Sequence, residues 1–107
     1  MPKSVYVFDG WRLDTGRLLL LNLSGVEVRL TSGEFAMLLV FCTRSQEIIP
    51  RADLLLRIGG KIYSNDRAID VRVTCIRQKI EVDPKRPVIL KTIRQEGYWF
   101  TPDVTVA

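Results

Sequence analysis

Histidine is absent from the 107 residues, and cysteine occurs only twice, at Cys42 and Cys75. The chain also lacks a nucleophile motif, a glycine-rich phosphate loop and any cysteine/histidine metal spacing, which argues against an enzyme. The two cysteines fall in segments that we expect to form different helices, so they are predicted to be free thiols. The sequence therefore predicts no catalytic residue, no cofactor and no metal ion.

Long apolar runs are also missing. Apolar runs such as Leu18–Leu21 and Ala36–Cys42 fall far short of the roughly 20 residues that a membrane-spanning helix needs. Residues 1–4 lack the basic region and long apolar region of a secretory signal peptide. We therefore expect no membrane partner and a cytoplasmic location. An apolar fraction of 47% and a charged fraction of 26% predict one globular domain across residues 1–107.

Positive charge, by contrast, is concentrated in one part of the chain. Residues 61–94 contain nine lysines and arginines against four acidic residues, whereas residues 1–60 contain seven against six, for a net charge of +4 overall. Such a local excess is typical of a surface that meets phosphate backbones. An anionic membrane surface or an acidic protein would attract the same charge.

Residues 1–30 alternate short β-prone segments with turns. The turn dipeptides Asp9-Gly10 and Ser24-Gly25 each separate two such segments. The predicted strands are Val5–Phe8, Trp11–Leu13, Arg17–Leu21 and Val26–Leu30. We expect them to form a four-stranded antiparallel sheet.

The apolar period then changes, and three helices are expected across residues 31–82. Thr31 and Glu34 fit a capping box, in which each side chain binds a free backbone N–H of the first turn. The apolar stripe predicted for this first helix contains Phe35, Leu38, Leu39 and Cys42. A second helix is expected to start at Pro50 and to stop at residues 59–60.

The third helix is predicted to run from Asn65 or Asp66 to about Val82, before Asp83-Pro84. Its buried stripe should contain Ile69, Val73, Ile76 and Ile80. The opposite face should carry Arg67, Val71, Thr74, Cys75 and Gln78, with Arg72 and Lys79 along one border and Arg77 along the other. An α-helix fits the major groove of B-DNA, where central side chains meet base edges and flanking cations meet phosphates.

Val71 is expected to be exposed although it is apolar, and so to reach the methyl group of a thymine. An ordinary solvated face with one harmless valine explains the helix pattern equally well. The hairpin predicted across residues 83–101 adds Lys91 and Arg94 near its tip. Basic groups at a hairpin tip suit an adjacent groove, although a plain edge hairpin would show the same residues.

Six blocks of the sequence occur in a characteristic order. They are Leu30–Phe35 with Leu38-Leu39, Arg51 with Leu54-Leu55, Asp66–Val73, Ile76–Ile80, Lys91–Arg94 and Gly97–Phe100. With this order and spacing the chain resembles, over nearly its whole length, the effector domain of bacterial OmpR/PhoB-type response regulators. The resemblance implies an α+β fold: a sheet, then a winged helix-turn-helix whose C-terminal hairpin is the wing.

The resemblance also implies sequence-specific binding of double-stranded DNA for transcription regulation in a two-component system. The recognition helix would lie in the major groove and the wing in the minor groove, as a homodimer on a direct or inverted repeat. With the border residue Lys79 included, the residues expected to face DNA are Arg67, Val71, Arg72, Thr74, Cys75, Arg77, Lys79, Thr92 and Arg94. The residues that would meet RNA polymerase are Gly59, Gly60, Lys61 and Ile62.

Three departures from the family pattern bear on function. Thr74 and Cys75 stand where relatives often include an arginine, so the base sequence that relatives read does not transfer to this chain. Glu96 falls in the wing turn, where a carboxylate would be unfavourable near phosphates. The 107 residues contain no phosphoacceptor receiver domain, which predicts a fragment or a standalone effector domain.

Two other interpretations stay open. A winged helix can serve protein–protein interaction alone, with its basic face on an acidic partner. Cys75, flanked by Arg72 and Arg77, can have a thiol of lowered pKa and act as a redox sensor. A small residue that fills a groove contact explains Cys75 as well.

Overall fold

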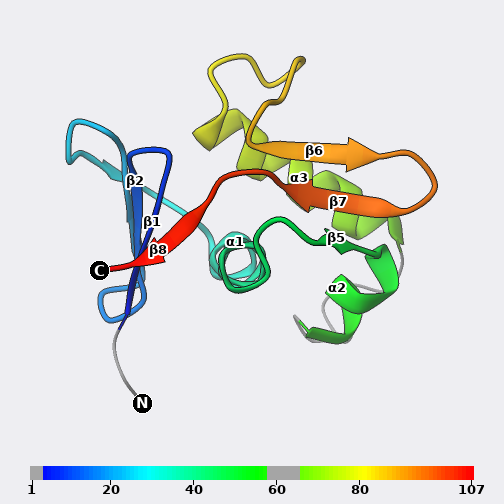
Figure 1. The fold of residues 1–107 in the computed structure, drawn as a ribbon, viewed down its shortest axis with the longest axis horizontal. Coiled ribbons are helices and arrows are strands. Elements are labelled where there is room, and N and C mark those ends of the chain that lie inside the picture. The colour runs from blue at the N-terminus through cyan, green and yellow to red at the C-terminus, as the bar shows by residue number, and fades with distance from the viewer. Residues whose placement is uncertain (1–3, 58–65) are drawn as a thin grey trace.

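The computed structural model describes residues 4–57 and 66–107 of the chain. Two antiparallel sheets lie on either side of helix α1 (Ser32–Thr43), which Figure 1 shows end-on between them. No helix in the two described ranges is long and apolar enough to cross a membrane. The stop predicted for the second helix at residues 59–60 lies outside the described residues.

The first sheet has five strands, one more than expected. They are β1 (Val5–Phe8), β2 (Trp11–Asp14), β3 (Leu19–Leu21), β4 (Glu27–Val28) and β8 (Val104–Val106), in the order β4-β3-β2-β1-β8. Asp9 and Gly10 both have positive φ, 48° and 85°, as predicted for a tight hairpin turn. The additional strand, β8, comes from the far end of the chain and pairs Val106 with Tyr6.

Helix α1 begins with the predicted capping box. The Thr31 hydroxyl accepts a hydrogen bond from the Glu34 N–H at 3.2 Å, and the Glu34 carboxylate accepts one from the Thr31 N–H at 2.8 Å. The predicted buried stripe was partly wrong, because Phe35 and Leu39 are only half-buried. The fully or nearly fully buried apolar residues are Met37, Leu38, Phe41 and Cys42. Eight consecutive apolar residues, 35–42, leave most of the helix without a polar side, so the sequence pattern could not distinguish the buried face.

Helix α2 (Arg51–Arg57) begins directly after Pro50, as predicted. Helix α3 (Asp66–Ile80) ends two residues before the predicted Val82. Its predicted buried stripe is confirmed, since no member is more than 2% exposed: Ile69, Val73, Ile76 and Ile80. These side chains pack toward α1 and α2, so the other side of α3 faces outward.

The second sheet contains the predicted hairpin and one unexpected strand. The hairpin, called the wing below, consists of β6 (Leu90–Ile93) and β7 (Gly97–Phe100), and β5 (Ile48–Ile49) pairs with β7. Gly97 has a φ of 144°, and a Cβ there would lie 2.2 Å from the carbonyl oxygen of Ile49. Only glycine therefore permits the close approach of β5 to the start of β7.

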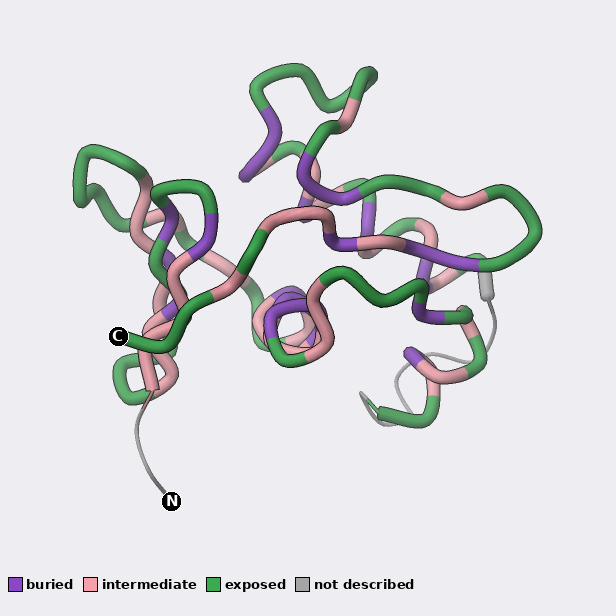
Figure 2. The backbone as a smooth tube through the Cα atoms, in the orientation of Figure 1, coloured by how far each residue is buried: buried purple, intermediate pink, exposed green. Residues whose placement is uncertain are grey.

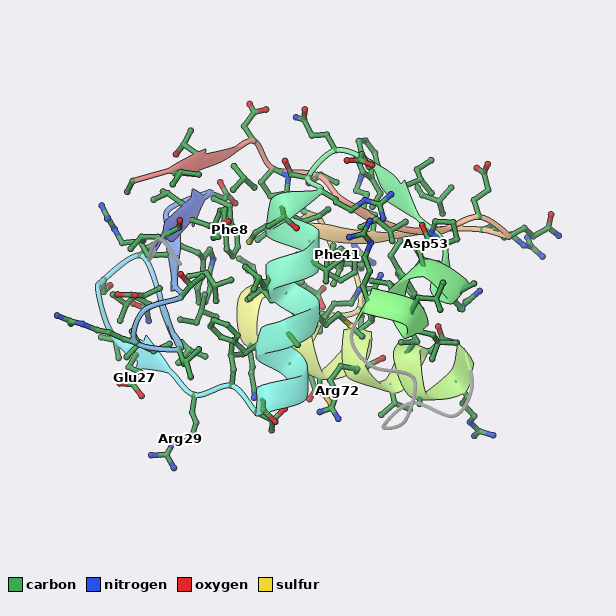
Figure 3. All side chains as sticks on the ribbon, turned by 90° about the horizontal axis from the view of Figure 1, so that it is seen from below. Phe8, Glu27, Arg29, Phe41, Asp53 and Arg72 are labelled. Carbon is green, nitrogen blue, oxygen red and sulfur yellow. The ribbon has the colours of Figure 1, made fainter. Side chains whose placement is uncertain are left out.

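Three phenylalanines join the sheets and α1 in one core. The Phe8 ring lies edge-on to Phe100 with centroids 5.0 Å apart, and Phe41 of α1 stacks on Phe100 at 6.0 Å. Figure 3 shows Phe8 and Phe41 on facing elements. Figure 2 shows the opposite extreme, since the turn of the wing and the loop after α3 are exposed. The exposed wing tip thus extends from a strand, β7, whose other end is packed in the core against α1 and the first sheet.

Candidate nucleic-acid interface

The outward side of α3 presents four exposed residues, called the α3 face below: Arg67, Val71, Thr74 and Gln78. Val71 is 58% exposed, so its predicted exposure is confirmed. The four side chains succeed one another at spacings of three or four residues and therefore form one stripe along the helix. Cys75, on the edge of this stripe, is half-buried.

Thr74 presents its methyl group rather than a free hydroxyl donor. Its Oγ1 donates a hydrogen bond to the Asp70 carbonyl oxygen at 3.0 Å. This bond is the usual arrangement for an exposed threonine within a helix, where the hydroxyl turns back along the axis. The middle of the α3 face, Val71 and Thr74, is consequently dominated by aliphatic groups.

The border with α1 contains Arg72 and Lys79. The Arg72 Nη1 donates to the Thr31 Oγ1 at 3.2 Å, near the N-terminal end of α1 (Figure 3). Lys79 forms an ion pair with Glu34, with Nζ and Oε1 2.5 Å apart. Burial alone would raise the pKa of Glu34, but the hydrogen bonds from Lys79 and the Thr31 backbone outweigh it and lower that pKa. Both cations thus hold α3 to α1 in addition to carrying positive charge.

Arg77, on the other border, is directed at the wing. Its Nε donates to the Leu90 carbonyl oxygen at 2.9 Å, and its Nη2 donates to the Thr92 Oγ1 at 2.8 Å. The guanidinium carbon lies 5.7 Å from the centroid of the Tyr98 ring. Burial lowers the pKa of Arg77. Arg77, which the sequence predicted to face DNA, therefore connects α3 to both strands of the wing.

A second arginine approaches the same tyrosine from α2. The Arg51 guanidinium lies 5.5 Å from the Tyr98 ring centroid, and its Nε donates to Asp70 Oδ1 at 2.8 Å. The Tyr98 hydroxyl donates to the same carboxylate oxygen. Burial, together with the neighbouring Asp70 carboxylate, raises the pKa of Tyr98 to about 12. The Tyr98 side chain therefore connects α2, α3 and the wing.

Glu81, directly after α3, is the residue of this region that sequence reasoning missed. Its buried carboxylate accepts hydrogen bonds from the backbone N–H groups of Val88, Ile89 and Leu90, at 2.8 to 3.1 Å. It therefore fixes the point at which the chain enters β6. One sequence feature could have indicated it, since a carboxylate at a helix C-terminus opposes the helix dipole and calls for a dedicated partner.

The wing carries its predicted site residues in exposed positions. Thr92 and Arg94 are both exposed, as is Lys91. Gln95 adopts a φ of 66°, which closes the turn in place of a glycine. The hydrogen bond from Arg77 to Thr92 places β6 beside the C-terminal half of α3. The helix and the wing are therefore neighbours on the surface of the domain.

The remaining predicted sites differ in how far the structure describes them. The four residues expected to meet RNA polymerase, Gly59, Gly60, Lys61 and Ile62, lie outside the described residues. Cys42 is buried, and burial raises the pKa of its thiol to about 12. The described residues contain no group of three or more His, Cys, Asp or Glu side chains that could hold a metal ion.

The arrangement of these elements defines the class of the domain. Helix α3 buries the stripe of Ile69, Val73, Ile76 and Ile80 on the side that packs toward α1 and α2. Its other side carries exposed residues, and its C-terminal half is hydrogen-bonded to a β-hairpin. This is a winged helix-turn-helix, the DNA-binding module of transcription regulators, which is not a class of enzymes. The chain belongs to the family described as "Transcriptional regulatory protein, C terminal", whose model matches residues 25–100.

Individual relatives agree with this family. The regulatory protein VirG of Agrobacterium tumefaciens is 38% identical over 105 residues, which cover 95% of this chain and 39% of VirG. The response regulator DrrB of Thermotoga maritima, an OmpR/PhoB homologue, has a TM-score of 0.81 at 31% identity, over 91% of this chain and 44% of DrrB. The DNA-binding domain of Klebsiella pneumoniae RstA was solved in complex with the RstA box. It has a TM-score of 0.80 at 28% identity, and the match covers 95% of this chain and 100% of the RstA domain. The chain thus spans less than half the length of VirG and DrrB.

Proposed function

We propose that this domain binds double-stranded DNA sequence-specifically, as the effector domain of a two-component response regulator, and that it has no catalytic activity. Helix α3 lies in the major groove, and the wing reaches the adjacent minor groove. Two relatives support the proposal. The DNA-binding domain of RstA was solved in complex with the RstA box, and DrrB is described as a response regulator.

The exposure of Val71 is the observation that carries the proposal. A valine that is 58% exposed in the middle of a helix, between exposed Arg67 and Gln78, has no packing duty within the described residues. In the major groove an aliphatic side chain contacts the thymine methyl group, while arginine and glutamine present donors to base edges. In the proposed complex, Val71 in the middle of the α3 face contacts a thymine methyl group, and Arg67 and Gln78 at its ends form hydrogen bonds with DNA.

Phosphate contacts surround this face in the proposed complex. Arg72 and Lys79 line one border, and Thr92 of the wing stands on the other, with Arg94 at the minor groove. Such contacts supply affinity and set the orientation of the helix, whereas base contacts supply the preference for a sequence. Arg72 must exchange or share its bond to Thr31 when it meets a phosphate.

Assembly and partners follow as parts of the same proposal. We expect two copies on a direct or inverted repeat, with half-sites about one helical turn apart. Residues 59–62 remain the segment proposed to meet RNA polymerase, and a cytoplasmic location follows from a chromosomal target.

Selection from a random duplex pool tests this function. Sequencing of the bound fraction should reveal an enriched repeat, and the purified domain should bind that duplex more tightly than a scrambled duplex of equal length. Because counterion release makes both affinities salt-dependent, they are compared at one salt concentration. If no sequence is enriched while an acidic protein partner is bound through the same cations, the interaction module is the correct function instead.

A further inference from the structure

We infer that Arg77 is a positioning residue, which sets the wing relative to the recognition helix and orients the Thr92 hydroxyl, and is not itself a phosphate ligand. The inference rests on the proposed function, because it concerns how the same DNA-binding surface is assembled. It also replaces the sequence-based expectation that Arg77 faces DNA.

Three contacts hold the Arg77 guanidinium in place. Nε donates to the Leu90 carbonyl oxygen at 2.9 Å, and Nη2 donates to the Thr92 Oγ1 at 2.8 Å. The Tyr98 ring lies 5.7 Å away on the other strand of the wing. A planar guanidinium with several fixed donors suits such a site, whereas a lysine ammonium could not reproduce the two diverging bonds and the ring contact together.

The surroundings of Arg77 oppose its release toward solvent or DNA. Tyr98 is held in turn by Asp70, which also binds Arg51, so the ring cannot follow a moving guanidinium without breaking that network. Leu90 is fully buried, and turning Arg77 away would remove the side-chain donor from its carbonyl oxygen. Retaining these bonds is therefore favoured when DNA is bound.

Thr92 is the point at which this arrangement reaches DNA. Its Oγ1 accepts from Arg77, and within the described residues no acceptor takes the proton of this hydroxyl. A phosphate oxygen can only accept a hydrogen bond, so a hydroxyl whose lone pair is already engaged is oriented to donate to it. Arg77 thus contributes to phosphate binding through Thr92 and through the position of the wing tip.

A double-mutant cycle between Arg77 and Arg94 tests the inference on the selected duplex. Arg94 lies at the wing tip and is not among the residues that Arg77 contacts. The contribution of Arg94 to DNA affinity therefore depends on the position of the wing. In the wild-type background, Arg94→Ala should weaken binding roughly tenfold, as expected for one lost DNA contact. In the Arg77→Gln background the same change should cost less than about twofold, because a misplaced wing has already lost the contact.

Two further measurements separate positioning from direct binding. Arg77→Lys keeps the charge and should nevertheless bind as weakly as Arg77→Gln, because it lacks the diverging donors. The slope of log affinity against log salt concentration should be the same for Arg77→Gln, Arg94→Ala and the double variant. Thermal unfolding of each variant sets the assay temperature below its transition, so that only folded protein is compared.

Additive losses in the cycle, near wild-type affinity of Arg77→Lys, or a further fall of the salt slope by about one in the double variant would each overturn the inference in favour of a direct phosphate contact. Full affinity of Arg94→Ala would also overturn the claim that Arg77 positions the wing tip, because Arg94 would then make no DNA contact that depends on the position of the tip. These results leave the proposed function intact. Equal binding of selected and scrambled duplexes by the wild-type domain would instead refute the proposed function and the inference with it.

Discussion

The α3 face and the junction of α3 with the wing contain similar polar residues but use them in opposite ways. On the α3 face, Arg67 and Gln78 are exposed around an aliphatic centre. At the junction, Arg77 and Glu81 direct their polar atoms to the backbone and side chains of the wing. The positive residues of α3 are therefore not all expected to contact DNA, because we propose that one arginine belongs to the interface and another holds the wing in place.

The largest expected effect of a single change lies at the junction. Glu81→Ala should lower the free energy of unfolding by about 3 kcal/mol, because it leaves the N–H groups of Val88, Ile89 and Leu90 without their common acceptor. Urea unfolding followed by circular dichroism measures the change. Glu96→Gln, an exposed carboxylate at the wing tip, is the matched control and should stay within about 0.5 kcal/mol of wild type. Equal stability of the two variants would refute the structural role of Glu81.

The border with α1 is expected to show an intermediate effect that depends on pH. The pKa of Glu34 is lowered from 4.5 in the folded state, so its contribution is present above pH 4.5 and is lost as the pH falls through the folded pKa. Glu34→Gln keeps the capping geometry but removes the charge that pairs with Lys79. It should cost about 1 kcal/mol at neutral pH and flatten the acid limb of a stability profile. An unchanged acid limb would assign the acid sensitivity to other carboxylates.

On the DNA side of that border, Arg72→Ala should weaken binding roughly tenfold on selected and scrambled duplexes alike, and should reduce the salt slope by about one. The reason is that a phosphate contact contributes no preference for a sequence. Arg29→Ala serves as the control, since Arg29 is an exposed arginine beside β4 on the first sheet. Fluorescence anisotropy at several salt concentrations provides the measurement. A loss confined to the selected duplex would show that Arg72 reads bases.

The smallest expected effect concerns the wing turn. Glu96→Gln removes a negative charge near the phosphates and should strengthen binding to every duplex by about twofold at low salt. The gain should fade as salt rises, because screening weakens the repulsion that the carboxylate causes. No gain at low salt would indicate that Glu96 points away from DNA in the complex.

The sequence predicted best where one face of an element differs sharply from the other. In α3 the isoleucines alternate with charged residues at the helical period, so both the buried stripe and the exposure of Val71 could be predicted. In α1 an unbroken apolar run covers every side of the helix, so the buried face could not be predicted from the sequence. Strands β5 and β8, of two and three residues, exist through pairing with β7 and β1, and no local pattern of that length indicates a strand.

The positions of the candidate site residues on α3 could be predicted from the sequence, but many of their contacts could not. Spacing along α3 placed Arg72, Arg77 and Lys79 on its borders, and the structure agrees. Spacing could not show that Arg77 binds the wing, that Lys79 pairs with Glu34, or that Glu81 holds the start of β6, because these partners lie 7 to 45 residues away in the chain. Such contacts depend on tertiary packing, which a single helix period does not contain.

The central claim is that Val71 reads a base pair from the outward side of α3. Replacing each thymine of the selected site by uracil removes one methyl group at a time, and binding is measured for the wild-type domain and for Val71→Ala. The account predicts one position at which the wild-type domain loses affinity and Val71→Ala does not, since the methyl contact is already gone. Equal losses for both proteins at every position, or no loss anywhere, would contradict it.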